Sequence, residues 1–372
     1  MNKIKVAWDN SLARKNRTGT GIYAACLLGQ LVSRADVTIE VFDGWPNSSG
    51  PRAVVSRAFH TAGNLVWTHV HLPLLLRKRN FDLLHSPAFT TPIVSPCPTV
   101  ITVHDLIYLL YPMFFPRWWV TYLKSLMPVT TRSAAAIICP SAHSKSDIVN
   151  TYKLPSCKVH VVPQGVNHKA YHRGAALDRG WAREIGIREG YLLHVSDLSH
   201  RKNIPTLLRA VAHLRSKGKL GERQLVLAGA ESPGMMGIDE IRKTIQQLDL
   251  SASVLLTGHV SDKRLPGLYA HASLFVMPSL YEGFGIPVLE SMSAGTPVVA
   301  SNISSLPEVA GDAAVLVAPL DSDALSNAIE DVLESKVLQS ELRAKGLARA
   351  SQFSWERTAG ETLGVYQSVI GS

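Results

Sequence analysis

The sequence predicts an α/β protein of two doubly wound domains, each a parallel sheet with helices on both faces. The 372 residues exceed what one ordinary hydrophobic core holds and are enough for two. Short apolar runs of β type alternate with longer helical patterns throughout the chain. These runs form two series, separated by a polar and irregular stretch between Asn167 and Gly190. Two series of the same kind predict two similar domains.

Each series contains six expected strands. Apolar runs of about four to six residues between helices are typical of parallel strands buried on both faces. The first series reads KIKVA, VTIEVF, FDLLH, TVITVH, AAIICP and KVHVVP. The second reads YLLHVS, QLVLAG, SVLLTG, SLFVMP, TPVVAS and AAVLVA. The expected domains are residues 1–170 and 171–352, and the helical pattern of residues 353–372 is a candidate to cross back to the first domain.

Composition limits the class of protein. Hydrophobic residues make up 46% of the chain and charged residues 18%, which describes a folded globular protein. The N-terminus, MNKIKVAWDN, has no apolar signal-peptide core, and no apolar run reaches the roughly 18 residues of a spanning helix. The four cysteines form no C-x-x-C pair, which argues against a zinc ribbon and suits a reducing compartment. We expect a cytoplasmic protein without a metal site.

Positive charge is concentrated in the first half of the chain. Residues 1–170 contain 18 Lys and Arg against 7 Asp and Glu, whereas the net charge of the whole chain is +9. A basic first domain is expected to meet an anionic partner such as a phosphate group, an acidic membrane surface or a nucleic acid. A basic surface that only aids solubility is the alternative. No known nucleic-acid motif with interleaved aromatic and basic residues is present.

A glycine-rich motif, TGTGIYA, occupies residues 18–24. Gly19 and Gly21 match the G-x-G-x-x-A fingerprint of dinucleotide-binding proteins, and Asp43 ends the next expected strand. That fingerprint directly follows the first strand, however, whereas a long loop intervenes here. Small residues at a helix start let backbone N–H groups approach an anion. The motif therefore predicts contact with a phosphate or an acceptor; dinucleotide binding and simple loop geometry are the alternatives.

Two further motifs follow strands, where ligand sites of doubly wound sheets lie. TVITVHDL contains His104, which would meet a substrate unless local backbone groups satisfy its ring. HVSDLSHRKN follows the first strand of the second series and contains Arg201 and Lys202. We expect Asn203 to cap the next helix, with Pro205 in its first turn. Two cations beside a helix start suit a diphosphate; an exposed basic loop is the alternative.

The segment Tyr281–Glu290, YEGFGIPVLE, is the most specific signal in the chain. Pro287 is expected in the first turn of a helix, which places Glu282 in the preceding loop and Glu290 one turn into the helix. The Gly-Phe-Gly segment of residues 283–285 can bring backbone amides close to a ligand. Carboxylates on both sides of these amides can accept hydrogen bonds from sugar hydroxyls. An ordinary helix with an acidic first turn would leave both glycines unexplained.

Two other features carry weaker predictions. LDSDAL, residues 320–325, has the spacing for a metal–nucleotide pair, but Asp321 is expected to cap a helix there instead. An aromatic stretch in the basic half is expected either to contact an anionic membrane or to pack in the ordinary way. It consists of Tyr108, Tyr111, Phe114, Phe115, Trp118, Trp119 and Tyr122.

The run from YLLHVSDLSHRKN through PSLYEGFGIPVLESMSAGTPVVASNISSLPEVAGDAA resembles the nucleotide-sugar-dependent glycosyltransferases of family 4. The resemblance is strongest from Tyr191 to Pro319 and is visible in TGTGIY, VHDLIYLLYP, CPSAHSKSDI and FSWERTA. It implies the GT-B fold, two Rossmann-like domains facing across a cleft. It also implies a retaining transfer that requires no metal, in which the departing phosphate takes the acceptor's proton.

The resemblance implies roles for individual residues. Glu290 would accept hydrogen bonds from the ribose hydroxyls of the donor, and Glu282 would sit near the transferred sugar. Lys202 and Arg201 would neutralise the diphosphate, and His104 would lie close to the donor sugar. The implied catalytic residues are thus His104, Glu282, Lys202 and Arg201. The implied donor-binding residues are Gly19, Gly21, Arg201, Lys202, His259, Val260, Glu282, Gly283, Phe284, Gly285, Ile286 and Glu290, with His259 and Val260 facing the base.

One position departs from the family pattern. Many members have Gly-Arg after the first strand of the second domain, where this chain has Ser196 and Asp197. If that arginine normally helps to hold the phosphate, Arg201 has to contribute more here.

The overall pattern is most similar to bacterial mannosyltransferases of polysaccharide assembly. This similarity predicts GDP-mannose as the donor, with a UDP-sugar as the alternative, and a saccharide acceptor carried on a lipid. We expect peripheral contact with the cytoplasmic face of an anionic membrane and none with nucleic acid. An NAD-dependent oxidoreductase or epimerase and a non-catalytic sugar-binding module are the remote alternatives.

Overall fold

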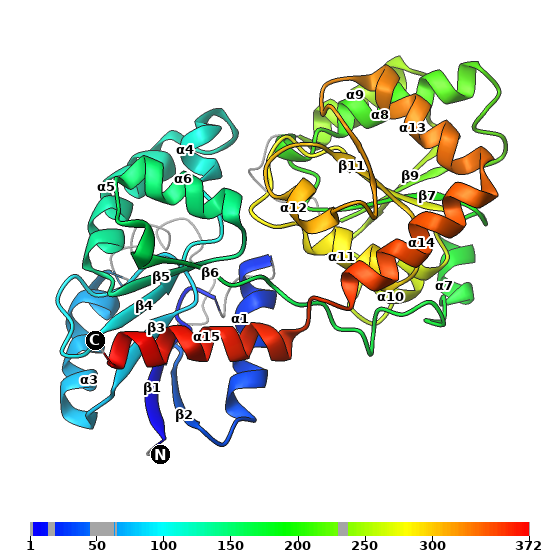
Figure 1. The fold of residues 1–372 in the computed structure, drawn as a ribbon. Helices are drawn as coiled ribbons and strands as arrows, with labels where there is room; N and C mark the ends of the chain where they lie inside the picture. The colour runs from blue at the N-terminus through cyan, green and yellow to red at the C-terminus, as the bar shows by residue number, and fades with distance from the viewer. Residues whose placement is uncertain (1–2, 14–18, 45–62, 64, 230–236, 372) are drawn as a thin grey trace. The chain divides into compact units, whose positions relative to one another are not determined.

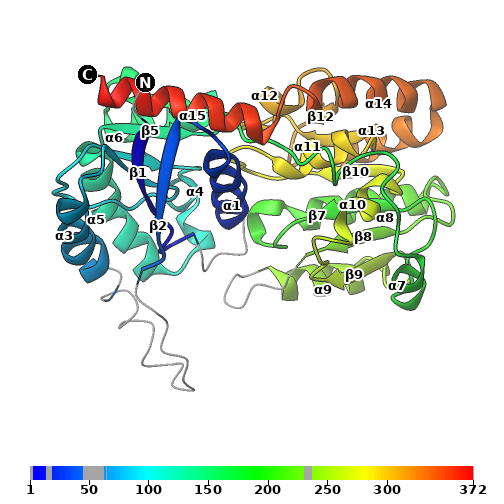
Figure 2. The same ribbon diagram turned by 90° about the horizontal axis from the view of Figure 1, so that it is seen from below.

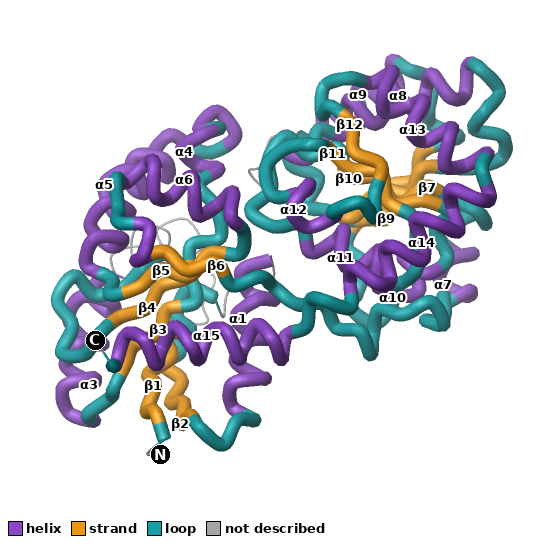
Figure 3. Tube along the Cα trace, viewed as in Figure 1, coloured by secondary structure: helices purple, strands orange, loops and turns teal. Residues whose placement is uncertain are grey.

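The computed structural model describes residues 3–13, 19–44, 63, 65–229 and 237–371. Its contacts divide the chain into two compact units. In each unit, helices lie on both sides of a parallel sheet (Figures 1 and 3). Unit 1 comprises Met1–Leu110, Pro116–Gln164 and Trp355–Ser372, and unit 2 comprises Tyr111–Phe115 and Gly165–Ser354.

Unit 1 is built on a six-stranded sheet in the order β2-β1-β3-β4-β5-β6, and every pair of neighbours is parallel. The strand order reverses between β1 and β3, as in doubly wound folds. The strands are β1 (Ile4–Asp9), β2 (Val37–Phe42), β3 (Leu83–Ser86), β4 (Thr99–Thr102), β5 (Ala136–Cys139) and β6 (Val159–Val161). The helices are α1 (Gly19–Val32), η1 (Trp67–His71), α3 (Leu72–Arg79), α4 (Ile107–Leu110), α5 (Arg117–Ser133), α6 (Ala142–Tyr152), η3 (Ser156–Lys158) and α15 (Trp355–Ile370).

The core of unit 1 lies on the two faces of this sheet. All residues of β3, β4 and β5 are buried, which is why none of these strands alternates between an apolar and a charged face. The final helix, α15, belongs to this unit, where it contacts α1 and β5. Figure 2 shows α15 running along one side of the sheet.

Unit 2 is built on a second six-stranded parallel sheet, in the order β12-β11-β10-β7-β8-β9. The strands are β7 (Leu192–Val195), β8 (Leu225–Ala228), β9 (Val254–Gly258), β10 (Leu274–Met277), β11 (Val298–Ser301) and β12 (Val315–Val317). The helices are η2 (Pro112–Phe114), α7 (Arg179–Glu184), η4 (His200–Lys202), α8 (Ile204–Ser216), α9 (Ile238–Gln247), α10 (Leu265–Ala270), α11 (Ile286–Ser293), α12 (Leu306–Ala310), α13 (Ser322–Glu334) and α14 (Lys336–Ala350).

Neighbouring residues of a strand in unit 2 serve two different cores. Leu193 and Phe275 belong to one apolar cluster, which includes residues of α10, α11 and α12. Leu192 and Val276 belong to the other, which includes residues of α8, α9 and α13. Because successive side chains of a strand point to opposite faces, a strand in a sheet covered on both faces is apolar at most positions rather than at every second one. This requirement explains the continuous apolar runs of the sequence.

The predicted fold class is confirmed, and each of the twelve expected strands is present. The irregular stretch after Asn167 contains one short helix, α7. Asp321 caps α13, since its carboxylate accepts hydrogen bonds from the backbone N–H groups of Asp323 and Ala324. Within the described ranges, no group of three or more His, Cys, Asp and Glu side chains is placed to hold a metal ion. None of the helices described is both long and apolar enough to cross a bilayer.

Candidate functional site

The central strands of unit 2, β7 and β10, are neighbours in the sheet although 78 residues lie between Val195 and Leu274 along the chain. The strand order reverses between them: β8 and β9 continue on one side, β11 and β12 on the other. Loops that leave two such strands at their carboxyl ends diverge and form a crevice in which ligands bind. The loop after β7 contains Arg201 and Lys202, and the loop after β10 contains Glu282.

Four charged side chains meet between these two loops. The Glu282 carboxylate accepts a hydrogen bond of 2.6 Å from Lys202 Nζ and one of 3.0 Å from Arg201 Nη1. Arg201 Nη2 donates to Asp197 Oδ2 at 3.2 Å, so its guanidinium lies between two carboxylates. We call Asp197, Arg201, Lys202 and Glu282 the ion cluster. The structure thus brings together three residues that the sequence singled out, Arg201, Lys202 and Glu282, through contacts that the sequence did not predict.

Burial and charge act against each other in the ion cluster. Burial disfavours the ionised form of Glu282, but Lys202 and Arg201 outweigh it, so the pKa of this carboxyl is lowered from its ordinary value. The pKa of Asp197 is also lowered, because Arg201 and Lys202 outweigh its burial. Burial and the adjacent Arg201 lower the pKa of Lys202, whereas Glu282 opposes that shift. Both acids are therefore ionised at neutral pH and hold the cations in place.

The Asn203 side chain connects the loop after β7 to the loop after β10. Its side-chain amide donates hydrogen bonds to the backbone carbonyls of Pro278 and Pro319, and its Oδ1 accepts one from the Thr206 hydroxyl. Its backbone is left-handed, with φ of 54°, a conformation that asparagine tolerates better than most residues. The expectation that its side chain caps α8 was wrong, since it accepts no hydrogen bond from a backbone N–H group of the first turn. The amide is used by the longer-range carbonyls instead, while Pro205 lies at the start of α8 as expected.

The loop that carries Glu282 is held by two serines. The backbone N–H of Glu282 donates to the Ser304 hydroxyl at 3.0 Å. The Ser305 hydroxyl lies 2.8 and 2.7 Å from the carbonyl oxygens of Glu282 and Phe284. Phe284 is buried in the core, so its ring anchors the loop from within. Gly285 has φ of +116°, and a Cβ there would lie 2.8 Å from Leu306 Cδ2. Both the backbone angle and the space require glycine at this position.

Glu290 lies on α11, which begins at Ile286 with Pro287 in its first turn, as the sequence predicts. Burial raises the pKa of the Glu290 carboxyl to about 7, and the nearby hydroxyls of Tyr269 and Tyr171 oppose the shift without cancelling it. A carboxyl with this pKa changes its charge near neutral pH. No contact found within the described residues joins Glu290 to the ion cluster.

The predicted base-facing turn follows β9, the edge strand of the unit 2 sheet. His259 is exposed, whereas Val260 is buried in the core cluster beneath α10 and α11. Asp262, two residues further on, contributes to the raised pKa of Glu290, which places this turn near that carboxyl. Of these two predicted residues, only His259 presents its side chain to solvent.

The remaining predicted residues belong to unit 1. Gly19 begins α1, and a Cβ at this position would meet no atom within 4 Å. Gly21 lines a hollow of about 550 Å³ together with Ala25 and Gly29 of the same helix. Both glycines therefore have open surroundings, as contact with a ligand would require. Thr18, the first residue of the motif, lies outside the described residues.

His104 follows β4 at the carboxyl end of the unit 1 sheet. Burial lowers the pKa of its imidazole to about 4, against a hydrogen bond to the backbone of Pro87. The ring is therefore neutral at pH 7, and its Nδ1 accepts a hydrogen bond of 3.1 Å from the Gln164 amide. The edge of the Tyr23 ring packs against it at 4.7 Å between centroids.

Sequence reasoning missed several residues that shape the site. Asp197 was noted only as a departure from a pattern, although its spacing of four from Arg201 would have suggested an ion pair. Tyr171 and Tyr269 beside Glu290 had no local signal, because they come from other parts of the chain. The same is true of Ser304 and Ser305.

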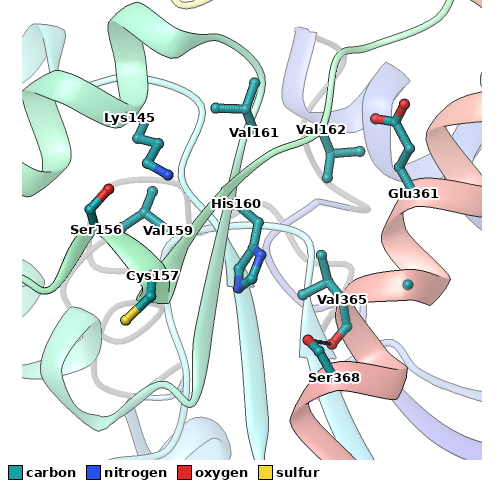
Figure 4. A pocket seen from close by; sticks show the side chains of 11 residues that line it. Lys145, Ser156, Cys157, Val159, His160, Val161, Val162, Glu361, Val365 and Ser368 are labelled. Carbon is teal, nitrogen blue, oxygen red and sulfur yellow. Dashed lines mark hydrogen bonds between the residues drawn. The ribbon is translucent and has the colours of Figure 1, made fainter.

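Unit 1 also has a groove of about 610 Å³ between β6 and α15, shown in Figure 4. Lys145 lies on one side of it and Glu361 on the other, with His160 between them. None of the residues singled out in the sequence lines it. We therefore assign this groove no part in the site.

Two protein-family models match the chain. The model described as "Glycosyltransferase Family 4" matches residues 18–170, and the model described as "Glycosyl transferases group 1" matches residues 181–349. The first match lies almost entirely in unit 1, and the second lies within unit 2.

Curated proteins with similar sequences include two bacterial mannosyltransferases. The chain is 32% identical over 293 residues to "O-antigen chain mannosyltransferase B" of Escherichia coli, covering 78% of this chain and 76% of the relative. It is 32% identical over 312 residues to "MMP alpha-(1->4)-mannosyltransferase" of Mycolicibacterium hassiacum, covering 79% and 72%.

Solved structures with the same fold cover almost the whole chain. Sucrose-phosphate synthase from Thermosynechococcus elongatus superposes with a TM-score of 0.78 at 20% identity, covering 99% of this chain and 100% of that one. HepE from Anabaena, in complex with UDP-glucose, superposes with a TM-score of 0.76 at 19% identity, covering 98% and 100%. At these identities the likeness concerns the fold.

Proposed function

The chain belongs to glycosyltransferase family 4 and has a GT-B-like fold, and from this premise we propose that it transfers mannose from GDP-mannose to a saccharide acceptor. The observation that carries the proposal is the ion cluster. Arg201 and Lys202 lie in the loop after β7, where it diverges from the loop after β10, and hydrogen bonds to Glu282 hold both of them in position. Two fixed cations in a crevice of this kind suit the negative charge of a diphosphate.

We propose that the donor lies across these loops, with its diphosphate at Arg201 and Lys202. The backbone amides of Gly283, Phe284 and Gly285 would complete the contacts with phosphate or sugar, and Ile286 at the start of α11 lies directly beyond them. Glu290 would accept hydrogen bonds from the ribose hydroxyls, and the turn at residues 259–260 would face the base. Gly19, Gly21 and His104 of unit 1 are the proposed further contacts.

The proposed reaction retains the configuration of the sugar. The bond from the anomeric carbon to the diphosphate oxygen breaks, the acceptor oxygen bonds to the same face of that carbon, and the departing phosphate oxygen takes the acceptor's proton. The lowered pKa of Glu282 and its two cationic partners make it a poor covalent nucleophile, which supports this route over a glycosyl-enzyme intermediate. The cations and helix starts would stabilise the leaving group without a metal.

The names of the relatives support mannose as the transferred sugar and a saccharide as the acceptor. Both curated relatives reported above are named as mannosyltransferases, and one of them is named for the O-antigen chain, a polysaccharide. We therefore propose GDP-mannose as the donor and a saccharide carried on a lipid as the acceptor, with the enzyme acting at the cytoplasmic face of a membrane.

A UDP-sugar is the second candidate donor. HepE shares its fold with nearly the whole chain, and its structure was solved in complex with UDP-glucose. The family membership argues against the remote alternative, a dinucleotide-dependent enzyme, that Gly19 and Gly21 suggested. In such an enzyme Asp43 would bind the ribose, whereas here its carboxylate accepts a hydrogen bond from the Asn10 side chain.

A panel of nucleoside diphosphates and nucleotide sugars tests the proposal. Ligand that binds the folded state raises the melting temperature in proportion to the logarithm of its concentration over Kd. We expect GDP and GDP-mannose to raise it most, and turnover of GDP-mannose to continue in the presence of a chelator. The anomeric configuration of the product is then read by NMR. Stabilisation by UDP and UDP-glucose alone would select the second candidate, and an inverted product would overturn the proposed route.

A further inference from the structure

An exposed row of aliphatic side chains runs along η1 and α3 of unit 1. Val66, Val70 and Leu74 recur at every fourth residue and are 46%, 50% and 54% exposed. The opposite side of these helices is also apolar, because Trp67 and Leu72 pack into the core. A surface helix that packs on one side normally carries polar residues on the other. Its second apolar side therefore calls for a partner.

A neighbouring loop adds to this row. The backbone N–H of Ile93 lies 3.5 Å from His69 Nδ1 of η1, which places the loop against the helix. Ile93 and Val94 are 51% and 80% exposed. Pro92 and Pro96 flank them, and the fixed φ of proline limits how far the loop can turn these side chains inward. We call Val66, Val70, Leu74, Ile93 and Val94 the apolar face.

The charges around the apolar face are positive. Lys78 continues the spacing of four after Leu74, and Arg77 lies beside it. Both are exposed at the end of α3, and within the part of the chain that the structure describes neither forms an ion pair, whereas Arg79 pairs with Glu40. Between Asp43 and Asp147 the only acidic residues of the sequence are Asp82 and Asp105.

The aromatic stretch fits the role of a membrane surface less well than the apolar face does. Tyr108 is buried, and its hydroxyl lies 2.8 Å from that of Tyr152. Trp119 stacks on Tyr122 and contacts Phe89. Only Trp118 within this stretch is more than half exposed, at 57%. Most of the stretch therefore serves packing.

We propose that the apolar face docks onto a membrane surface that carries anionic lipid headgroups. Its aliphatic side chains enter the boundary between headgroups and acyl chains, while Arg77 and Lys78 lie at the lipid phosphates. The combination of exposed aliphatic residues with adjacent cations favours this partner over a second copy of the basic unit 1, whose like charges would repel. Membrane docking is separate from the transfer reaction. It rests on the proposed function only in that a lipid-linked acceptor would give the enzyme a reason to bind a membrane.

Flotation of the full chain with lipid vesicles tests the inference. We expect the protein to float with phosphatidylcholine vesicles that contain phosphatidylglycerol, and less with phosphatidylcholine alone. A variant with Val70→Ser, Leu74→Ser and Val94→Ser should reduce vesicle binding more than about tenfold at every salt concentration, because it removes apolar insertion. Arg77→Gln with Lys78→Gln should reduce binding at low salt by about fivefold per cation and weaken its salt dependence.

The matched control removes exposed aliphatic side chains elsewhere. Leu320→Ser with Val337→Ser changes residues that are 75% and 78% exposed, and this variant should float like the wild type. All variants should keep the wild-type melting temperature and the turnover of a water-soluble acceptor, which separates the docking from the transfer reaction. Failure of the wild type to float, or equal flotation of the apolar and control variants, would overturn the proposal. The proposal would also be overturned if sedimentation showed that the wild type self-associates and that the apolar variant does not.

Discussion

The Glu282 carboxylate accepts a hydrogen bond of 2.6 Å from the buried ammonium group of Lys202. Its other oxygen accepts one from Arg201, so a single carboxylate engages both cations of the proposed diphosphate site. An arriving diphosphate and Glu282 would compete for the same charges. We therefore propose that Glu282 serves as an internal anion, which keeps the cations ordered until the donor replaces part of its contacts.

Replacing Glu282 by alanine should separate stability from nucleotide binding. Lys202 would lose its carboxylate in a buried position, and breaking one side of a buried ion pair costs about 3–5 kcal/mol. The melting temperature should fall accordingly, whereas GDP, which no longer competes with the carboxylate, should bind at least as tightly as to the wild type in calorimetry. Turnover should be lost. Glu282→Gln keeps the shape and serves as the control; unchanged stability of the alanine variant would contradict the internal-anion role.

Lys202→Met tests the cation itself. A hydrogen bond to a charged group contributes about 1.5–3 kcal/mol, so GDP affinity should fall about tenfold to a hundredfold. Lys217→Met is the matched control, because Lys217 lies in the same unit, half-exposed, in a loose ion pair with Glu330 at 3.9 Å. Titration calorimetry with GDP reads both variants. Equal affinity of the two would remove Lys202 from the proposed site.

Asn203 should be sensitive to changes that keep its size. Asn203→Asp retains the acceptor for Thr206 but cannot donate to the carbonyls of Pro278 and Pro319. Buried carbonyls without donors cost about 1–3 kcal/mol each, so urea unfolding should show a loss of a few kcal/mol. Asn203→Gly, which accepts the left-handed backbone, distinguishes the hydrogen bonds from backbone strain. A glycine variant as stable as the wild type would show that the backbone angle alone matters.

Replacement by alanine should have different effects on stability at Gly285 and at Gly19. Gly285→Ala would combine φ of +116° with a Cβ 2.8 Å from Leu306 Cδ2, so we expect a loss of about 1–3 kcal/mol and a displaced Glu282 loop. At Gly19 a Cβ meets nothing within 4 Å, so Gly19→Ala should leave stability unchanged. Thermal unfolding of both variants checks this contrast. Equal destabilisation would mean that the space around Leu306 is not decisive.

The strands could be predicted because the information that specifies them is local. In YLLHVS, for example, Leu192 and Leu193 face opposite cores, and a strand covered on both faces is apolar at most positions. The first turn of α11 was also predictable, since Pro287 marks a helix start wherever the helix lies.

The site was only partly predictable because its contacts depend on strand order. Asn203 bonds to residues 75 and 116 positions away along the chain, which meet it only because β7 and β10 are neighbours. No local pattern carries this information, so the residue was taken for a helix cap. Asp197 differs, because its partner Arg201 is four residues away. Its pairing was missed because Asp197 lies in a loop, where a spacing of four residues does not by itself predict a contact.

Glu290 predicts a pH dependence of stability. Burial raises its pKa from 4.5 to about 7 in the folded protein, so between these values the folded state holds a proton that the unfolded state has lost. The stability contributed by this group is fully present below about pH 4.5 and is lost as the pH rises through about 7. Glu290→Gln, which cannot ionise, should show no such decline from this position. Urea unfolding of both proteins from pH 5 to about pH 8 reads the difference.

Nucleotide binding should respond to the same ionisation with the opposite sign. A carboxylate accepts hydrogen bonds from two ribose hydroxyls, whereas the protonated acid has lost part of this capacity. GDP affinity of the wild type should therefore rise as the pH increases through about 7, while the affinity of Glu290→Gln is weaker and less dependent on pH. Pyrophosphate, which lacks ribose, controls for the titration of the phosphates and should show the same pH dependence in both proteins. If the wild type and Glu290→Gln bind GDP with identical pH profiles, Glu290 does not hold the ribose, and the donor must be placed differently on unit 2.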